Sequence, residues 1–152
     1  MKKLFSILLF TALMGMVFTA CGDDKNEPDV PTAKNLVSVH ENDETDQYFV
    51  FDIDINKDWS TIYMYNIQFA PGAHQMTLRV NVPVSLSSNK DAYVMTGTDL
   101  VAEREQEIGW LPMSDERFLL KNLSCTVNPD KKEYSISFDA HSGHFEESGK
   151  LM

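Results

Sequence analysis

The sequence predicts an all-β domain built from antiparallel strands. Apolar and polar side chains alternate with a period of two over much of residues 36–152, which is the spacing that places every second side chain on one face of a sheet. Turn-forming residues interrupt this pattern at intervals of roughly 10–15 residues, and segments with helix-forming composition are scarce. About seven or eight strands are expected, and either a small closed barrel or a two-sheet β-sandwich satisfies this pattern.

The first strands of this domain are short. A brief strand is expected at 37–40, and large apolar residues occupy every second position of 49–55. The segment 63–69 repeats the alternation, so Tyr63 and Tyr65 are expected on a buried face.

The clearest alternation runs through residues 76–86. Apolar side chains from Met76 to Leu86 alternate with Thr, Arg, Asn, Pro and Ser. Pro83 interrupts the segment, and because proline has no N–H to donate to a sheet it marks a bulge, an edge or a break between two shorter strands. A further short strand is expected within 93–101.

The C-terminal part predicts a β-hairpin. Segments 119–127 and 134–140 both show strand alternation, and the intervening 128–132 contains Pro129 at a position where proline favours a turn. Another strand is expected at 145–151. By contrast, 101–107 is short and rich in Glu, and it is interpreted as a loop with at most a turn of helix and a solvated charged surface.

The N-terminus has the anatomy of a signal peptide. Lys2 and Lys3 precede an uncharged segment, 4–20, which is shorter than the ~20 residues that a membrane-spanning helix needs. Phe18-Thr19-Ala20-Cys21 resembles the bacterial lipobox, which implies cleavage after residue 20 and acylation of Cys21. Two or more acyl chains would hold the protein stably on a bilayer.

The expected organisation is therefore a lipoprotein signal peptide at 1–20, a lipidated Cys21 with an acidic flexible tether at 21–35, and a single β domain at 36–152. The acidic residues directly after Cys21 resemble the surface-export signal of Bacteroidetes lipoproteins. That resemblance implies an outer-membrane protein facing the cell surface, with the periplasmic face as the alternative. A plain charged spacer has the same composition.

The order of the β segments carries a second resemblance. The segments concerned are 62–70, 76–84, 93–97, 118–127 and 148–151. Together they resemble the calycin-like domain of Bacteroidetes lipoproteins, which implies a small antiparallel calycin-like barrel of about eight strands, with the sandwich as the alternative. The calycin analogy also implies a ligand in the mouth of the barrel, but it transfers no functional residues.

The charge balance excludes one class of partner. With 13 Lys and Arg against 23 Asp and Glu, the formal net charge is −10, so the chain lacks the basic surface that neutralises a phosphate backbone. We therefore expect no nucleic-acid partner.

No cofactor, metal or catalytic group is predicted. The pattern Asp52–Asp58 imitates the start of a calcium loop, but Lys57 replaces the required Gly and Tyr63 the bidentate Glu. His141 and His144 are too few to form a zinc site.

Nucleophilic and acid–base chemistry also lack support. Cys125 lies on an apolar strand face, which predicts a buried and unreactive thiol. Glu146 and Glu147 are adjacent on a strand and should point apart. The sequence therefore favours a protein that is not an enzyme.

Trp59 and Trp110 are the candidate ligand-binding residues. Both lie in loop-like surroundings, where an indole can stack on a sugar ring or anchor an interface, and the alternative is that each covers an end of the core. The predicted function is a lipid-anchored envelope protein whose non-enzymatic β domain binds a small molecule, a glycan or an envelope protein. A structural accessory subunit of an outer-membrane complex is the alternative.

Overall fold

The protein is described by a computed structural model that covers residues 36–39, 46–69, 72–140 and 143–152. The predicted signal peptide, Cys21, the acidic tether and His141 lie outside these residues, so their expected roles remain predictions. Within them the structure contains strands and one short 3-10 turn.

Eleven strands make up the described part of the chain. Their bounds are β1 (Leu36–Val39), β2 (Tyr48–Asp52), β3 (Ser60–Ile67), β4 (Met76–Val82), β5 (Val84–Leu86), β6 (Tyr93–Gly97), β7 (Glu103–Gln106), β8 (Gly109–Pro112), β9 (Lys121–Asn128), β10 (Glu133–Ala140) and β11 (Gly143–Leu151). The 3-10 turn η2 (Glu116–Phe118) precedes β9.

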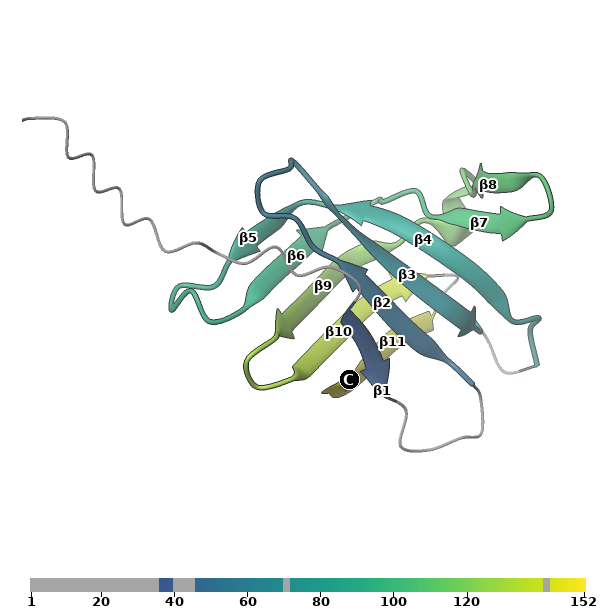
Figure 1. Ribbon diagram of the computed structural model, residues 1–152. Helices are drawn as coiled ribbons and strands as arrows, with labels where there is room; N and C mark the ends of the chain where they lie inside the picture. Colours follow the sequence, from purple (N-terminus) through teal and green to yellow (C-terminus); the bar gives the residue numbers. More distant parts are fainter. Residues whose placement is uncertain (1–35, 40–45, 70–71, 141–142) are drawn as a thin grey trace, which may run out of the picture. The chain divides into compact units, whose positions relative to one another are not determined.

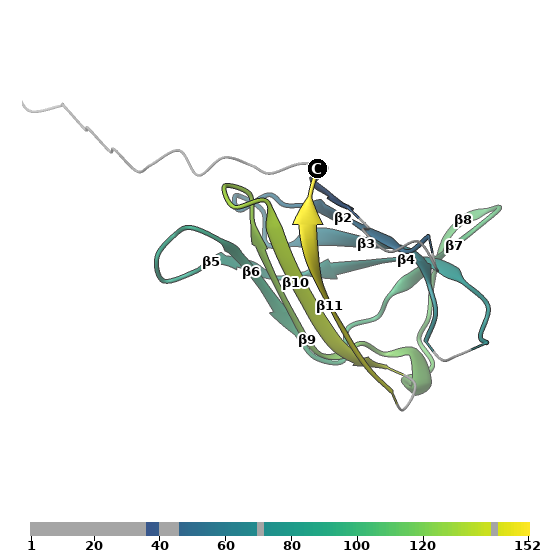
Figure 2. The same cartoon turned by 90° about the horizontal axis from the view of Figure 1, so that it is seen from below.

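The strands form two antiparallel sheets of five strands each (Figures 1 and 2). The first sheet has the order β2-β3-β4-β7-β8, and the second has the order β5-β6-β9-β10-β11. Strand β1 links them, because Leu36 pairs with Phe51 of β2 while Ser38 pairs with Leu151 of β11. Each sheet places one face on a shared core.

The all-β class is confirmed, and the arrangement corresponds to the two-sheet alternative. The ladder runs from β5 to β8 without these two end strands pairing, so the sheet is not closed into a barrel. Eleven strands replace the expected eight or so because several are only three or four residues long, and strands that short leave little alternation in a sequence.

Pro83 lies where the chain leaves one sheet for the other. Strand β4 ends at Val82 in the first sheet, and β5 begins at Val84 in the second. Pro83 is exposed and supplies no N–H to either ladder, which confirms the predicted break into two shorter strands.

The predicted faces of β3 are wrong for two tyrosines. Ile62, Met64 and Ile67 are buried, whereas Tyr63 and Tyr65 lie on the outer face. The register between β3 and β4 shifts between Met64 and Ile67, where Asn66 has a φ of 56°. This bulge inserts an extra residue and reverses the alternation, so counting every second residue back from Ile67 selects the wrong face.

The prediction that residues 101–107 form a loop with at most a turn of helix is also wrong. Residues 103–106 and 109–112 pair as the hairpin β7–β8, and β7 joins β4 through Arg79 opposite Glu103. Pairing with an existing strand overrides a helix-forming composition, as often happens in short segments. The expected solvation is confirmed, because residues 104–109 are all exposed.

The hairpin predicted at residues 119–140 is confirmed as β9–β10. Asn128 pairs with Glu133 across a turn in which the Asn128 side chain accepts a 2.9 Å hydrogen bond from the Lys131 N–H. Strand β11 then pairs antiparallel with β10 over eight residue pairs, and its nine residues exceed the shorter strand that the sequence predicts at 145–151.

The space between the two sheets is filled by side chains. The largest fully buried ones are Phe49, Phe51, Phe138, Ile53, Ile62, Met64, Ile67, Leu78, Met95, Leu120, Leu123 and Ile136. Cys125 is buried among them as a free thiol, which confirms its predicted burial, and loss of solvation raises its pKa. Because the centre is packed, an internal site can form only near the ends of the sheets.

Candidate functional site

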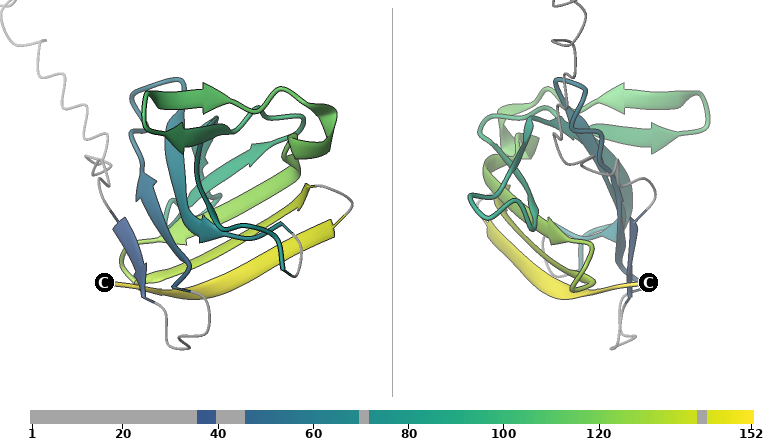
Figure 3. Two further views of the ribbon diagram at one scale, coloured as in Figure 1. Left: turned by 90° about the vertical axis from the view of Figure 1, so that its right-hand side faces the viewer. Right: turned by 60° about the vertical axis from the view of Figure 1, so that its left-hand side comes forward.

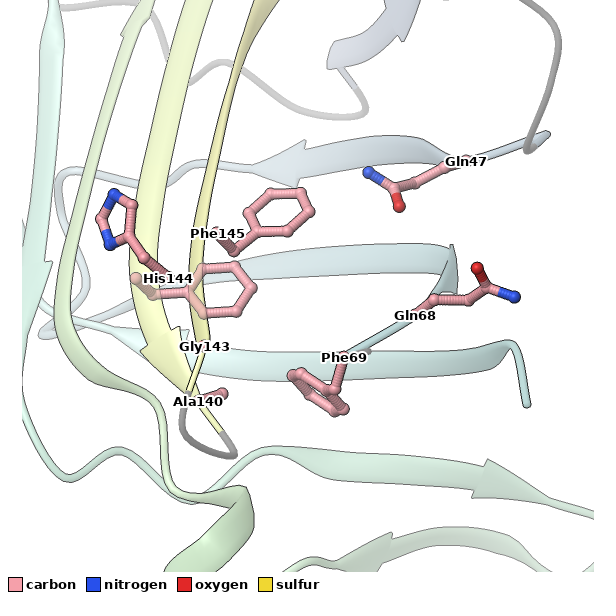
Figure 4. Close-up of a pocket in the computed structure, with 8 residues that line it drawn as sticks. Gln47, Gln68, Phe69, Ala140, Gly143, His144 and Phe145 are labelled. Atoms are coloured by element: carbon pink, nitrogen blue, oxygen red, sulfur yellow. The ribbon is translucent and has the colours of Figure 1, made fainter. Parts of the chain in front are cut away.

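A cleft of about 440 Å³ opens at one end of the double layer, which we call the inner cleft. It lies where β2 begins, β3 ends, and β10 passes to β11 (Figure 4). The lining residues are Gln47, Gln68, Phe69, Phe138, Ala140, Gly143, His144 and Phe145. The inner cleft is thus formed by segments that are far apart in the sequence.

Aromatic rings form the apolar wall of the inner cleft. Phe138 and Phe145 lie on β10 and β11 and stack with ring centroids 4.8 Å apart and planes inclined by 16°. Phe145 also meets Phe49 at 6.1 Å, and Phe69 meets Phe118 at 6.3 Å. These contacts hold the rings in fixed orientations, so a flat apolar group entering the cleft would meet a preformed surface.

Two carboxamides form the polar side of the inner cleft. The Gln47 Nε2 donates a 2.6 Å hydrogen bond to the Glu147 carboxylate, and the Gln68 Nε2 donates a 2.9 Å hydrogen bond to the Ala73 carbonyl. Only the amide nitrogen can donate to these oxygens, so both bonds fix which end of each carboxamide faces the protein. Figure 4 shows the two carbonyl oxygens pointing into the space between Gln47 and Gln68.

Glu147 lies directly behind this polar side. It is two residues from Phe145 on β11, on the same half-buried face, and it also accepts a 2.7 Å hydrogen bond from the Tyr134 hydroxyl. Glu146 is exposed on the opposite face, which confirms that the adjacent carboxylates point apart. The Glu147 carboxylate is therefore held directly behind Gln47, one of the residues that line the inner cleft.

A second depression, the outer cleft, lies on the other side of the same strand ends. Its volume is about 670 Å³, and it is lined by Glu116, Arg117, Leu119, Lys121, Asp139, Ala140, Gly143 and His144. Here His144 Nδ1 lies 2.7 Å from Asp139 Oδ1, and Asn122 Nδ2 donates a 2.8 Å hydrogen bond to Asp139 Oδ2. Hydrogen bonds from Asn122 and His144 lower the pKa of the Asp139 carboxyl.

The candidate metal patterns form no cluster in the described ranges. Among those residues, no group of three or more His, Cys, Asp and Glu side chains could hold a metal ion. Asp54 instead organises the β2–β3 turn, where its Oδ1 accepts a 3.1 Å hydrogen bond from the Asn56 N–H and its carboxylate lies 3.5 Å from Lys57 Nζ.

The two tryptophans lie outside both clefts. Trp59 is in the β2–β3 turn with 59% of its surface exposed. Trp110, on β8, is half-buried over the outer face of the first sheet, with its ring 6.0 Å from Tyr63 and Arg79 Cζ 4.7 Å from its centroid. Arg79 in turn bonds Glu103 of β7 at 2.5 Å, so Trp110 fixes the hairpin base to the sheet.

The residues of the inner cleft were not recognised as a site from the sequence. Phe69, Phe138 and Phe145 fit the alternation of ordinary core residues, and Gln47 and Gln68 belong to no motif. The one available signal is that Glu147 falls in phase with Phe145 and Leu151, on the face of β11 where an apolar side chain is expected.

Comparisons with known proteins do not extend this description: no family model, curated protein or solved structure matches the chain. The described residues also contain no helix with the length and hydrophobicity that a bilayer crossing needs.

Proposed function

We propose that this chain is a lipid-anchored cell-envelope protein whose β domain binds a small molecule in the inner cleft without catalysing a reaction. The observation that carries the proposal is the inner cleft itself, where Phe69 and Phe145 face two oriented carboxamides at the end of a packed double layer. Ligand sites of ~300–1,000 Å³ typically combine apolar walls with a few fixed polar groups, and about 440 Å³ falls in that range.

The envelope location rests on the N-terminal sequence. The signal-like segment 4–20 and Cys21 support acylation, and the acidic residues that follow support export to the outer surface of the outer membrane, with the periplasmic side as the alternative. The test is metabolic labelling with radioactive palmitate. Label should enter the native chain and be absent from Cys21→Ala, and a native chain without label contradicts the anchor.

Ligand binding is tested by blocking the inner cleft. A Cβ at Gly143 would come no closer than 3.6 Å to another atom, and Gly143 does not have a positive φ, so Gly143→Leu can be accommodated and would project into the cleft. Glu146→Leu is the matched control, because Glu146 lies on the exposed face of β11 and lines neither cleft.

The readout is mass spectrometry of small molecules that purify with each chain. A molecule present with the native chain and with Glu146→Leu, but lost from Gly143→Leu, supports the proposal. The proposal is contradicted if Gly143→Leu retains the same small molecules as the native chain, or if the native chain retains none.

A role as an accessory subunit is the second candidate, favoured by the β7–β8 hairpin. Figure 3 shows this hairpin projecting beyond the other strands at the edge of the first sheet, and its tip residue Ile108 has 83% of its surface exposed. Glu105 and Glu107 flank the tip, so a protein partner would present a basic and partly apolar surface.

This second role is tested by crosslinking in intact cells. A photoreactive residue at position 108 should capture a defined envelope protein, and one at exposed Ser85 on β5 should not. Equal capture from both positions, or none from position 108, contradicts the accessory role.

A further inference from the structure

We infer that the ligand of the inner cleft is an amine: a small molecule with a flat apolar group and a cationic nitrogen. The inference rests on the proposed function, because it names the class of ligand for the same cleft. The observation behind it is that the polar groups of this cleft present hydrogen-bond acceptors.

The carboxamides are the first source of acceptors. Gln47 and Gln68 both use Nε2 to bond the protein, at the Glu147 carboxylate and the Ala73 carbonyl respectively. Their Oε1 atoms therefore remain as the ends that face the cleft (Figure 4). A ligand that meets both oxygens must donate hydrogen bonds, as an ammonium or another N–H or O–H group does.

Charge then selects among the donors. Of the cleft-lining residues that the structure describes, none is Lys or Arg, and the imidazole of His144, which also lines the cleft, has its Nδ1 2.7 Å from the Asp139 carboxylate. The Glu147 carboxylate lies behind Gln47, whose Nε2 it contacts at 2.6 Å. The chain as a whole carries −10. This field attracts a cation and opposes a carboxylate or a phosphate.

The aromatic wall suits the same ligand. Phe69 and Phe145 are the partly exposed rings of the wall, and fully buried Phe138 supports Phe145 from behind by stacking at 4.8 Å. The faces of aromatic rings are electron-rich and attract ammonium groups. An amine would thus place its apolar part against the rings of Phe69 and Phe145 and its charged end between the two carboxamide oxygens.

The test compares three probes that share one ring and differ in the head group: 2-phenylethylamine, 2-phenylethanol and 3-phenylpropanoate. Binding to the full chain is measured by isothermal titration calorimetry. The amine should bind at least about 10-fold more tightly than the alcohol, and the carboxylate more weakly than both, because one charge–charge contact at low exposure is of that order. A carboxylate that binds as tightly as the amine overturns the inference.

Two isosteric variants locate the charge. Glu147→Gln removes the carboxylate behind Gln47 and should weaken the amine about 5- to 10-fold while leaving the alcohol nearly unchanged. Glu146→Gln removes the same charge from the opposite, exposed face of β11 and should change neither affinity. Equal losses in both variants would show a general effect of net charge and would contradict the assigned position.

The failure of this inference and that of the proposed function give different results. If the carboxylate or the alcohol binds best and Gly143→Leu abolishes that binding, the cleft is a ligand site and the ligand is not an amine. If none of the probes binds, the amine inference is overturned, and the co-purification comparison of Gly143→Leu with Glu146→Leu decides the proposed function separately.

Discussion

The Tyr134 hydroxyl donates a 2.7 Å hydrogen bond to the Glu147 carboxylate, from β10 to β11. The two residues are not directly opposite each other, because Tyr134 pairs with Gly149 and Glu147 pairs with Ile136. The tyrosine therefore crosses over Gly149 to reach the carboxylate. This diagonal contact fixes Glu147, which in turn holds Gln47 at the inner cleft.

Gly149 is expected to be required for that contact. A Cβ at this position would lie 3.0 Å from Tyr134 Cε1 and 3.2 Å from its hydroxyl oxygen. Gly149→Ala should therefore displace the ring and lower the free energy of unfolding by about 1–3 kcal/mol, measured by urea denaturation. Gly143→Ala is the control, since its new Cβ meets nothing within 3.6 Å, and its effect should stay within about 0.5 kcal/mol. Equal losses of stability in the two variants would contradict the close packing of the Tyr134 ring over Gly149.

Asn122 should control the acid titration of Asp139. Its amide is the largest cause of the lowered Asp139 pKa, and Asn122→Gly removes the amide while tolerating the φ of 52° at this position. The carboxyl pKa, followed by NMR, should rise toward its ordinary value of about 3.9. An unchanged Asp139 pKa in the variant would show that the 2.8 Å bond has no electrostatic effect in solution.

The same shift determines how Asp139 affects stability at low pH. A carboxyl whose pKa is lowered by folding binds fewer protons in the folded state than in the unfolded state. Its stabilising contribution is thus fully present above about pH 4 and is lost as the pH falls through the lower, folded-state pKa. Native protein should lose this contribution on acidification, whereas Asn122→Gly should show a weaker dependence over the same pH range.

Cys125 should be unreactive while the protein is folded. It is fully buried, and desolvation raises its pKa, so little thiolate is present and reagents cannot reach it. In Cys21→Ala it is the single thiol of the chain. A thiol reagent at pH 8 should label it only after urea is added, with a rate that follows unfolding. Rapid stoichiometric labelling without urea would contradict the burial.

The two tryptophans should differ in their contribution to stability. Trp110 contacts Tyr63 and Arg79 and joins the β7–β8 hairpin to the first sheet, so Trp110→Ala should cost about 1–2 kcal/mol of unfolding free energy. Trp59 is largely exposed in a turn, and Trp59→Ala should change stability by less than about 0.5 kcal/mol. Urea denaturation measures both, and a larger cost at Trp59 would contradict the two placements.

Alternation predicted the fold wherever a strand is long and one face is buried. This holds for the segment around Pro83, where buried Val80 and Val82 precede the break, and for the hairpin that turns after Asn128. It failed at Tyr63 and Tyr65 because Asn66 adds a residue to β3, and a single extra residue exchanges the two faces of a strand. It also failed in β7, where pairing with β4 is a tertiary effect that the local composition does not contain.

The site was less accessible to sequence reasoning than the fold. The sequence predicts the tryptophans as ligand-binding residues because large aromatic residues in loops often bind ligands. In the structure, Trp110 packs against the sheet and Trp59 lies in a turn. The inner cleft depends instead on where the ends of β2, β3, β10 and β11 meet in space. Gln47 and Phe145 are nearly 100 residues apart in the chain, and no local pattern places them together.

The most direct test of the account is to locate a bound ligand on the molecule by NMR. The full chain, labelled with ¹⁵N, is titrated with 2-phenylethylamine while the backbone amide signals are followed. We expect saturable shifts centred on Gln47, Gln68, Phe69, Gly143 and Phe145, and their loss in Gly143→Leu. Shifts centred on Trp59 or Trp110, or none that saturate, would contradict the assignment of the inner cleft as the binding site.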